Sequence, residues 1–269
     1  MAYLLHLYCV MKRFVSLFAI FFIMGASAIF AQETGEITLI KTDGNVETKT
    51  FDLNSKSMDF SGSSLKEIKG LEAFTKLVKL DVHWNQLTSL DVSKNILLTE
   101  LNVGNNQLTS LDISKNELLS TLYAHKNQLT SLDVSKNVLL STLHVSENQL
   151  TSLDVSKNVL LDKLYVYKNL LTSMDLSNNV SLSVFRALFN RLESLDVSKN
   201  VLLTELNVAN NPLTSLDVSK NILLITLFVY GNKLTSLDVS NNAKLVTLKV
   251  NPSVTVISGD NTNLKIILN

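Results

Sequence analysis

The six-residue stretch LDVSKN at residues 90–95 recurs with small changes every 21 residues, and this repetition constrains the fold more than any other feature. Eight units run without a gap from residue 80 to residue 247. One unit offers about seven apolar side chains, worth roughly 10–20 kcal/mol when buried. Ordering the backbone of one such unit costs roughly 20–40 kcal/mol. A lone unit therefore cannot fold, and we expect the units to stack around one shared core.

Each unit has two halves of the form L-x-V-x-x-N, and residues 98–108 match the pattern L-x-x-L-x-L-x-x-N-x-L. With this pattern the chain resembles the leucine-rich repeat family, and most of all the short-repeat, internalin-like proteins of bacterial surfaces. The resemblance covers residues 58–253. It implies a mostly β repeat solenoid whose inner face is a curved parallel β-sheet.

The first half of each unit is the predicted sheet strand. Its apolar residues alternate with polar ones, as a half-buried strand requires. The degenerate first unit from Met58 supports this assignment, because the connector KGLEAFTKLVK after it has apolar residues at spacing three and is expected to be helical. The LDVSKN half then lies on the convex return path, as turns or as a second row of short strands.

A column of asparagines closes the first half of every unit. The side-chain amide can donate to and accept from backbone groups that are exposed where the strand turns. We therefore predict a structural ladder made of Asn85, Asn106, Asn127, Asn148, Asn169, Asn190, Asn211 and Asn232.

The N-terminus has the order of regions found in a secretory signal peptide. Lys12 and Arg13 precede the apolar run 14–24, and small residues follow it. We predict a leader at residues 1–31, cleaved after Ala28 or Ala31, with translation starting at Met1 or Met11. A retained membrane anchor is the alternative, because residues 14–31 carry no charge.

The rest of the chain divides into three predicted segments. Residues 32–57 form an N-terminal cap, in which Asp43-Gly44 between alternating stretches indicates a β-hairpin. Residues 58–253 hold the leucine-rich repeats. Residues 254–269 break the repeat and are expected to form a C-terminal cap that covers the last coil.

Charge and cysteine content exclude several classes of function. Without the basic pair of the leader, 22 basic residues stand against 24 acidic ones, and a nucleic-acid-binding surface needs a basic patch. The single cysteine precedes the apolar run, so the mature chain lacks a thiol nucleophile and a cysteine zinc site. We predict no catalytic residues, no metal and no cofactor, and expect a protein that is not an enzyme.

The units differ mainly at three outward positions of the first half. These positions hold the only tryptophan and all tyrosines and histidines of the mature chain. Aromatic and arginine side chains dominate binding hot spots. We therefore predict a binding face on units three to six, formed by Tyr123, His125, Lys126, His144, Tyr165, Tyr167, Lys168, Arg186 and Phe189. The alternative is that these side chains only stabilise the sheet across its strands, or vary because nothing constrains them.

The aspartate of LDVSKN suggests a calcium-binding column. Calcium requires six to eight oxygen ligands around one ion, and the glycine-rich calcium repeat is absent. Lysines three residues later can offset the repulsion between neighbouring carboxylates. We interpret the column as structural or solvated, without metal: Asp91, Asp112, Asp133, Asp154, Asp175, Asp196, Asp217 and Asp238.

These features predict an exported, non-enzymatic interaction module. Its expected partner is an extracellular or envelope protein, or a glycan, bound on the concave face. We expect a monomer that is secreted, periplasmic or on the cell surface and has no membrane span after the leader is removed. The alternative function is a structural scaffold of the cell envelope without a specific ligand.

Overall fold

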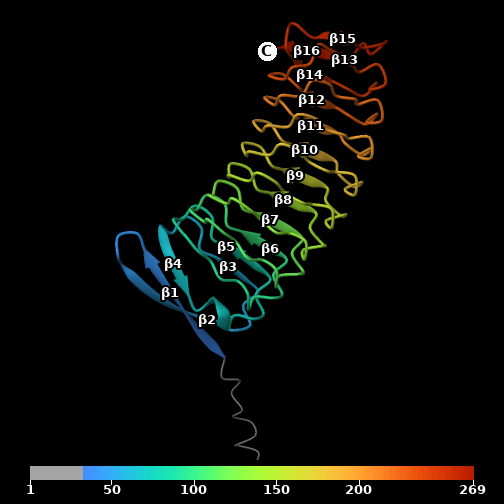
Figure 1. The fold of residues 1–269 in the computed structure, drawn as a ribbon. Helices are drawn as coiled ribbons and strands as arrows, with labels where there is room; N and C mark the ends of the chain where they lie inside the picture. The colour runs from blue at the N-terminus through green and yellow to red at the C-terminus, as the bar shows by residue number, and fades with distance from the viewer. Residues whose placement is uncertain (1–32) are drawn as a thin grey trace, which may run out of the picture. The chain divides into compact units, whose positions relative to one another are not determined.

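The computed structural model describes residues 33–269, so the predicted leader at residues 1–31 lies outside the described residues. Residues 35–269 form one compact unit. Within it the chain winds as stacked coils, and the stack bends along its length (Figure 1). No helix in the described part of the chain has the length and apolarity of a membrane span. The predicted curved parallel solenoid is confirmed.

The first half of each of the eight units forms a strand, as predicted, and these strands with β3, β14 and β16 build one 11-stranded sheet in the order β16-β14-β12-β11-β10-β9-β8-β7-β6-β5-β3. Every pair is parallel, and Leu101 for example is aligned with Leu122. The strands are β3 (Ser57–Asp59), β5 (Lys79–Asp81), β6 (Glu100–Asn102), β7 (Thr121–Tyr123), β8 (Thr142–His144), β9 (Lys163–Tyr165), β10 (Val184–Arg186), β11 (Glu205–Asn207), β12 (Thr226–Phe228), β14 (Thr247–Val250) and β16 (Lys265–Leu268).

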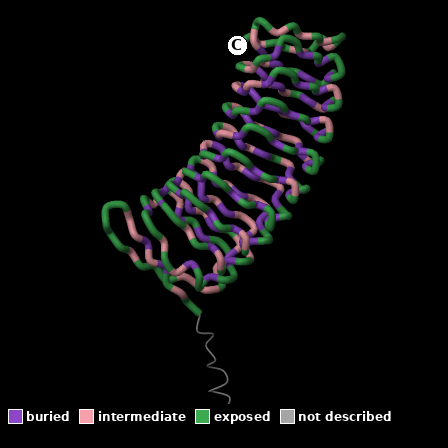
Figure 2. The backbone as a smooth tube through the Cα atoms, viewed as in Figure 1, coloured by how far each residue is buried: buried purple, intermediate pink, exposed green. Residues whose placement is uncertain are grey.

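One continuous apolar core fills the inside of the coils (Figure 2). In a typical unit Leu101, Val103, Leu108 and Leu119 have no exposed surface, and the same positions are buried in the neighbouring units. Parallel pairing in register places each of these side chains against its equivalent one coil away, which is how stability accumulates between units. The consequence is that a polar side chain at one of these positions disturbs at least three coils.

Two asparagine ladders satisfy the backbone at the turns. In the predicted ladder, Asn106 donates through Nδ2 to the carbonyls of Val82 (2.9 Å) and Val103 (3.0 Å), and its Oδ1 accepts from the Leu87 amide (3.0 Å). A second, unpredicted ladder is fully buried on the return path and consists of Asn95, Asn116, Asn137, Asn158, Asn179, Asn200, Asn221 and Asn242. Each such bond contributes about 0.5–1.5 kcal/mol to stability.

The return path is made mostly of turns, because the LDVSKN aspartate competes for the backbone. Asp112 Oδ1 accepts from the Ser114 amide at 2.9 Å, and the same bond recurs at the equivalent position of the other units. Within residues 33–269, two return segments pair in parallel only at the end of the stack, β13 (Ser236–Asp238) and β15 (Thr255–Ile257). Turns and short strands, the two predicted forms of the return path, thus both occur.

The N-terminal segment is a small antiparallel sheet in the order β2-β1-β4, formed by β1 (Thr34–Lys41), β2 (Val46–Asp52) and β4 (Leu65–Lys69). β1 and β2 form a hairpin whose turn contains Gly44 at a φ of 87°. Phe51 packs edge-on against Phe60 and Phe74, at centroid distances of 5.8 and 6.2 Å. The hairpin therefore lies against the apolar end of the first coil.

The prediction that the connector at residues 69–79 is helical is wrong except for one turn. Only the 3-10 turn η1 (Leu71–Ala73) is helical, and it follows Gly70 at a φ of 94°. Leu71, Phe74 and Leu77 are buried as the spacing indicated. Three apolar residues at this spacing are satisfied by a single tight turn, because the connector has to return to the sheet within one coil.

Candidate functional site

The variable outward positions of the main sheet form rows, because each strand pairs in register with the next repeat. Tyr123 of β7 is aligned with His144 of β8, His144 with Tyr165 of β9, and Tyr165 with Arg186 of β10. Each follows a fully buried leucine or phenylalanine, so alternation turns it away from the core. These four side chains stand side by side on the side of the sheet that faces away from the core, which we call the sheet face.

Four rings on the sheet face surround the ring of His144, and each of them contacts it. Its ring centroid lies 6.3 Å from that of Tyr123, 5.1 Å from Tyr165 and 5.7 Å from Tyr167. The ring of His125 stacks on it at 4.3 Å with an interplanar angle of 13°. We call these five residues the aromatic cluster. Pairs of this kind contribute about 0.5–1.5 kcal/mol beyond the burial of their area, so the cluster is an ordered surface.

Small residues on the neighbouring coils make room for the cluster. A β-carbon on Gly104 would lie 2.4 Å from Cε1 of His125, so only glycine allows this ring to lie where it does. Ser146, at the equivalent position two units on, is completely buried. The column Gly104, His125, Ser146, Tyr167 thus alternates small and large side chains, which lets the large ones lean over the small ones.

Both histidines of the cluster are held in the neutral form. Burial, followed by the charges of His125 and Arg186, lowers the pKa of His144 to about 4. Burial is also the main cause that lowers the pKa of His125, and Lys126 adds to it. The Nε2 atom of His125 faces the Asn105 side-chain amide at 3.1 Å. At neutral pH the two rings are therefore uncharged and present aromatic surface.

Arg186 closes one side of the cluster. Its Nε and Nη2 donate to the two carboxylate oxygens of Glu205, at 2.5 and 3.0 Å, and its guanidinium lies 5.5 Å from the ring centre of Tyr165. Donation to the Glu205 carboxylate raises the pKa of the Arg186 guanidinium. Between these groups lies an open hollow of about 350 Å³, lined by Tyr123, Thr142, His144, Lys163, Tyr165, Tyr167 and Arg186.

Four of the nine predicted binding residues lie outside this hollow. His125 supports it from one side through its stack on His144. Lys126 and Lys168 flank Glu147, with Nζ–Oε distances of 4.0 and 3.1 Å. The side chain of Phe189 is 47% exposed and makes no ring contact with the described residues. The other five predicted residues converge on one site.

Comparison with known proteins gives matches among solved structures. No protein-family model matches the sequence, and no match is found among curated proteins. The functional domain of InlJ from Listeria monocytogenes, which includes a cysteine ladder, is 30% identical over 82% of this chain and 57% of that chain, with a TM-score of 0.55. Internalin C2 from Listeria monocytogenes str. 4b F2365 is 19% identical over 81% of this chain and 83% of that chain, with a TM-score of 0.56.

The chain is an internalin-like leucine-rich repeat protein. It spans 57% of the length of the InlJ domain. A third match is the leucine-rich repeat ectodomain of the plant membrane receptor kinase GASSHO1/SCHENGEN3 from Arabidopsis thaliana, in complex with CASPARIAN STRIP INTEGRITY FACTOR 2. It is 22% identical over 75% of this chain and 28% of that chain, with a TM-score of 0.60.

Sequence reasoning missed two residues of the hollow in this leucine-rich repeat protein, Thr142 and Lys163. Both precede the buried leucine of their strand, and that position also faces outward in an alternating strand. The sequence does show the signal, because this position varies between units as Glu100, Thr121, Thr142, Lys163, Val184 and Glu205.

Sequence reasoning also missed the backbone conformation at the third outward position of each unit, which is the second residue after the valine or alanine of the first half. All residues at this position have a positive φ, between 51° and 70°, and they are Trp84, Asn105, Lys126, Glu147, Lys168, Phe189, Asn210 and Gly231. Bulky residues rarely adopt this left-handed conformation, whereas asparagine and glycine accept it. Asn105, Asn210 and Gly231 were therefore a readable signal for a tight turn after each strand.

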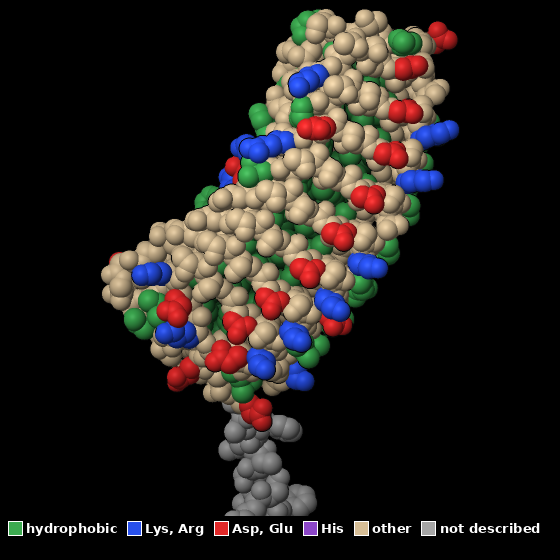
Figure 3. Space-filling view, viewed as in Figure 1, with side chains coloured by type: hydrophobic (Ala, Val, Ile, Leu, Met, Phe, Trp, Pro, Cys, Tyr) green, Lys and Arg blue, Asp and Glu red, His purple; other side chains and the backbone are tan. Residues whose placement is uncertain are grey.

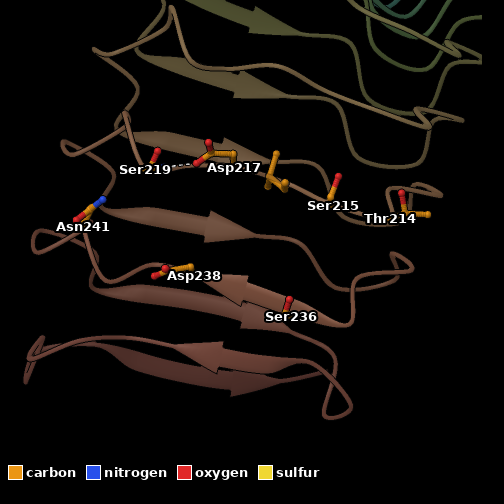
Figure 4. Close-up of a pocket in the computed structure, with 8 residues that line it drawn as sticks. Thr214, Ser215, Asp217, Ser219, Ser236, Asp238 and Asn241 are labelled. Carbon is orange, nitrogen blue, oxygen red and sulfur yellow. Dashed lines mark hydrogen bonds between the residues drawn. The ribbon is translucent and has the colours of Figure 1, made fainter.

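The aspartate column lies on the return path as a row beside a row of basic side chains (Figure 3). Hydrogen bonds from the serine two residues later lower the pKa of Asp112 and of its equivalents. Near the end of the stack, Asp217 bonds to the Ser219 amide and shares a shallow pocket with Asp238 and Asn241 (Figure 4). Each carboxylate is thus used to shape its own turn.

The two stacked histidines are poorly placed to share a metal ion. The nitrogen lone pairs of imidazole lie in the plane of the ring, and the rings of His125 and His144 are nearly parallel. Their lone pairs therefore do not converge on one point between them. Among residues 33–269 no group of three or more histidine, cysteine or acidic side chains has the geometry to hold a metal ion.

Proposed function

We propose that this protein is a non-enzymatic interaction module that binds a protein partner on its sheet face, at the aromatic cluster. One observation carries the proposal: four aromatic rings contact the ring of His144. Arg186 lies beside them. Tyrosine and arginine provide large contact area and polar groups at a low entropic cost, which is why they dominate hot spots.

Two further points support a binding role. The matched plant ectodomain is a leucine-rich repeat domain in complex with another molecule. The cluster also has an open hollow at its centre, and pockets lined by aromatic side chains with a few polar groups suit recognition. We infer that the partner is an extracellular or envelope protein, with a glycan as the second ligand class, and that the exported protein acts as a monomer.

A binding screen tests this proposal. The protein without residues 1–31 is screened against purified extracellular proteins and glycans, next to the variant Tyr123→Ala, Tyr165→Ala, Tyr167→Ala. The matched control replaces three other rings of the sheet face: Trp84→Ala, Phe228→Ala, Tyr230→Ala. All three proteins are compared by circular dichroism, so that a loss of binding is not mistaken for a loss of folding.

The expected result is a ligand that binds the parent and the control but not the cluster variant. Removal of a hot-spot ring costs about 2 kcal/mol or more, which is at least roughly 30-fold in affinity. A ligand that binds the cluster variant as well as the parent would move the site elsewhere. Absence of any ligand would favour the alternative, a structural scaffold of the envelope.

A further inference from the structure

The hollow in the aromatic cluster carries more positive than negative charge. Lys163 and Arg186 line it, no carboxylate is among its lining residues, and Glu205 forms an ion pair with Arg186. The mature chain as a whole has more acidic than basic residues. The positive charge is therefore local to this site and is not a general property of the surface.

Lys163 has no counterion among the residues that the structure describes. Its aligned neighbours on the adjacent strands are Thr142 and Val184, which are uncharged. No ion pair joins its Nζ to any of the described carboxylates, whereas Lys79 at the equivalent position of another strand contacts Glu100 at 2.8 Å. An unpaired ammonium group at the edge of a hollow attracts an anion from outside.

Hydrogen-bond donors outnumber acceptors in the hollow. Glu205 occupies Nε and Nη2 of Arg186, and Nη1 has no partner among the described residues. The hydroxyl groups of Tyr123, Tyr165 and Tyr167 likewise make no hydrogen bond within residues 33–269. Phenolic hydroxyls, ammonium and guanidinium groups all donate. The site thus offers several donors around one space.

We propose that this hollow binds the carboxylate of a glutamate or aspartate side chain that a protein partner presents to the sheet face. The inference rests on the proposed function and names the chemistry of its central contact. Charge-assisted hydrogen bonds to carboxylate are about twice as strong as neutral ones. A cationic ligand would be repelled by Lys163 and Arg186, and a neutral sugar would stack on the tyrosines without using either charge.

Two peptides test the inference. The first is a ten-residue peptide of alternating glutamate and glycine with blocked ends, and the second has glutamine in place of glutamate. Binding is measured by titration calorimetry at low salt and by the NMR signals of the Arg186 Nε–H group. We expect the acidic peptide to bind about 10-fold more tightly than the glutamine peptide and to shift the Arg186 signal.

Variants locate the contact. Lys163→Gln should lower the affinity for the acidic peptide several-fold, and Lys163→Glu should abolish it. Lys163 is an exposed surface residue, so these variants keep the core intact. Lys157→Gln, on the return path, is the matched control and should bind like the parent. Equal affinity of the Lys163→Gln variant and the parent would overturn the proposal.

The same experiment separates the inference from the proposed function. A glucuronic acid hexamer is titrated in parallel, and tighter binding of this glycan than of the peptide would overturn the assignment to a protein side chain. If neither acidic probe binds while a screened protein still requires the three tyrosines, the carboxylate inference fails and the interaction module stands. If the acidic peptide binds but screened ligands ignore the tyrosines, the proposed function fails instead.

Discussion

The imidazole rings of His125 and His144 stack 4.3 Å apart on adjacent coils, at an angle of 13°. One unit positions each ring, so the pair exists only because two coils are in register. This stack supports the wall of the hollow that His144 forms. It also brings together two groups that would repel each other if both were protonated.

The first prediction is that acid destabilises the protein through His144. Its folded pKa of about 4 lies below the ordinary value of 6.5, so the unfolded chain binds the proton first. The contribution is complete above pH 6.5 and is lost as the pH falls towards 4. With a discount for solvent screening, about 1–2 kcal/mol is lost across this window.

Thermal unfolding of the parent and of His144→Phe, measured between pH 7 and pH 5, checks this prediction. The phenylalanine variant keeps a ring against His125 and should lose less stability than the parent. The aspartates of the return path also have lowered pKa values, but their effect lies below their ordinary pKa of 3.8. Identical losses in the two proteins over this pH range would contradict the role of His144.

The second prediction concerns the close approach of Gly104 and His125. Gly104→Ala places a methyl group 2.4 Å from the ring, so the ring has to move or the strand has to shift. We expect a loss of about 1–3 kcal/mol in urea unfolding, as for other overpacked sites. The double variant Gly104→Ala, His125→Ala should recover most of it. No recovery would mean that the glycine is needed for another reason.

The sequence was sufficient to predict the stack of coils, because 21-residue periodicity and the buried leucines leave few other arrangements. It also placed Tyr123, His144, Tyr165 and Arg186 in one row, since parallel strands in register align equivalent positions. Five of the predicted binding residues do line one hollow. Register follows from the repeat alone, and side-chain neighbours on a sheet follow from register.

The parts that the sequence did not predict depend on local geometry. The stacking of His125 on His144 requires the space above Gly104, which is known only once both coils are built. The ion pair between Arg186 and Glu205 crosses to the next strand and joins two different outward columns. The prediction of a helical connector was wrong because apolar residues three apart fit a single 3-10 turn as well as a helix.

The third prediction uses the left-handed column. Phe189 has a φ of 55°, and the exposed ring makes no ring contact with the described residues that would offset the strain. A left-handed conformation costs an ordinary residue about 1–2 kcal/mol, and glycine adopts it freely. Phe189→Gly should therefore raise the free energy of unfolding by about 0.5–1 kcal/mol.

Phe189→Ala is the control for this gain, because it removes the same ring but keeps the β-carbon. It should leave the free energy of unfolding nearly unchanged in urea denaturation. A similar gain from alanine and glycine would assign the effect to the exposed ring instead of the backbone. At Gly231, where φ is 70°, Gly231→Ala should destabilise the protein for the same reason.

The fourth prediction compares two adjacent asparagines of one return segment. Asn179 is fully buried, and its Nδ2 donates to the carbonyls of Val155 (3.0 Å) and Asn158 (2.9 Å) one coil away. Asn178 is exposed. Asn179→Ala leaves two buried carbonyls without this donor and should cost about 2–4 kcal/mol, whereas Asn178→Ala should change stability by less than about 0.5 kcal/mol.

Urea unfolding of both variants measures this difference, and hydrogen exchange locates it. Each coil is stabilised only by contacts with its nearest neighbours. Asn179→Ala should therefore speed amide hydrogen exchange most in the coils that hold Val155, Asn158 and Asn179. Equal stability of the two variants would show that the second ladder is dispensable. A uniform increase in exchange along the whole stack would show instead that the coils unfold as one unit.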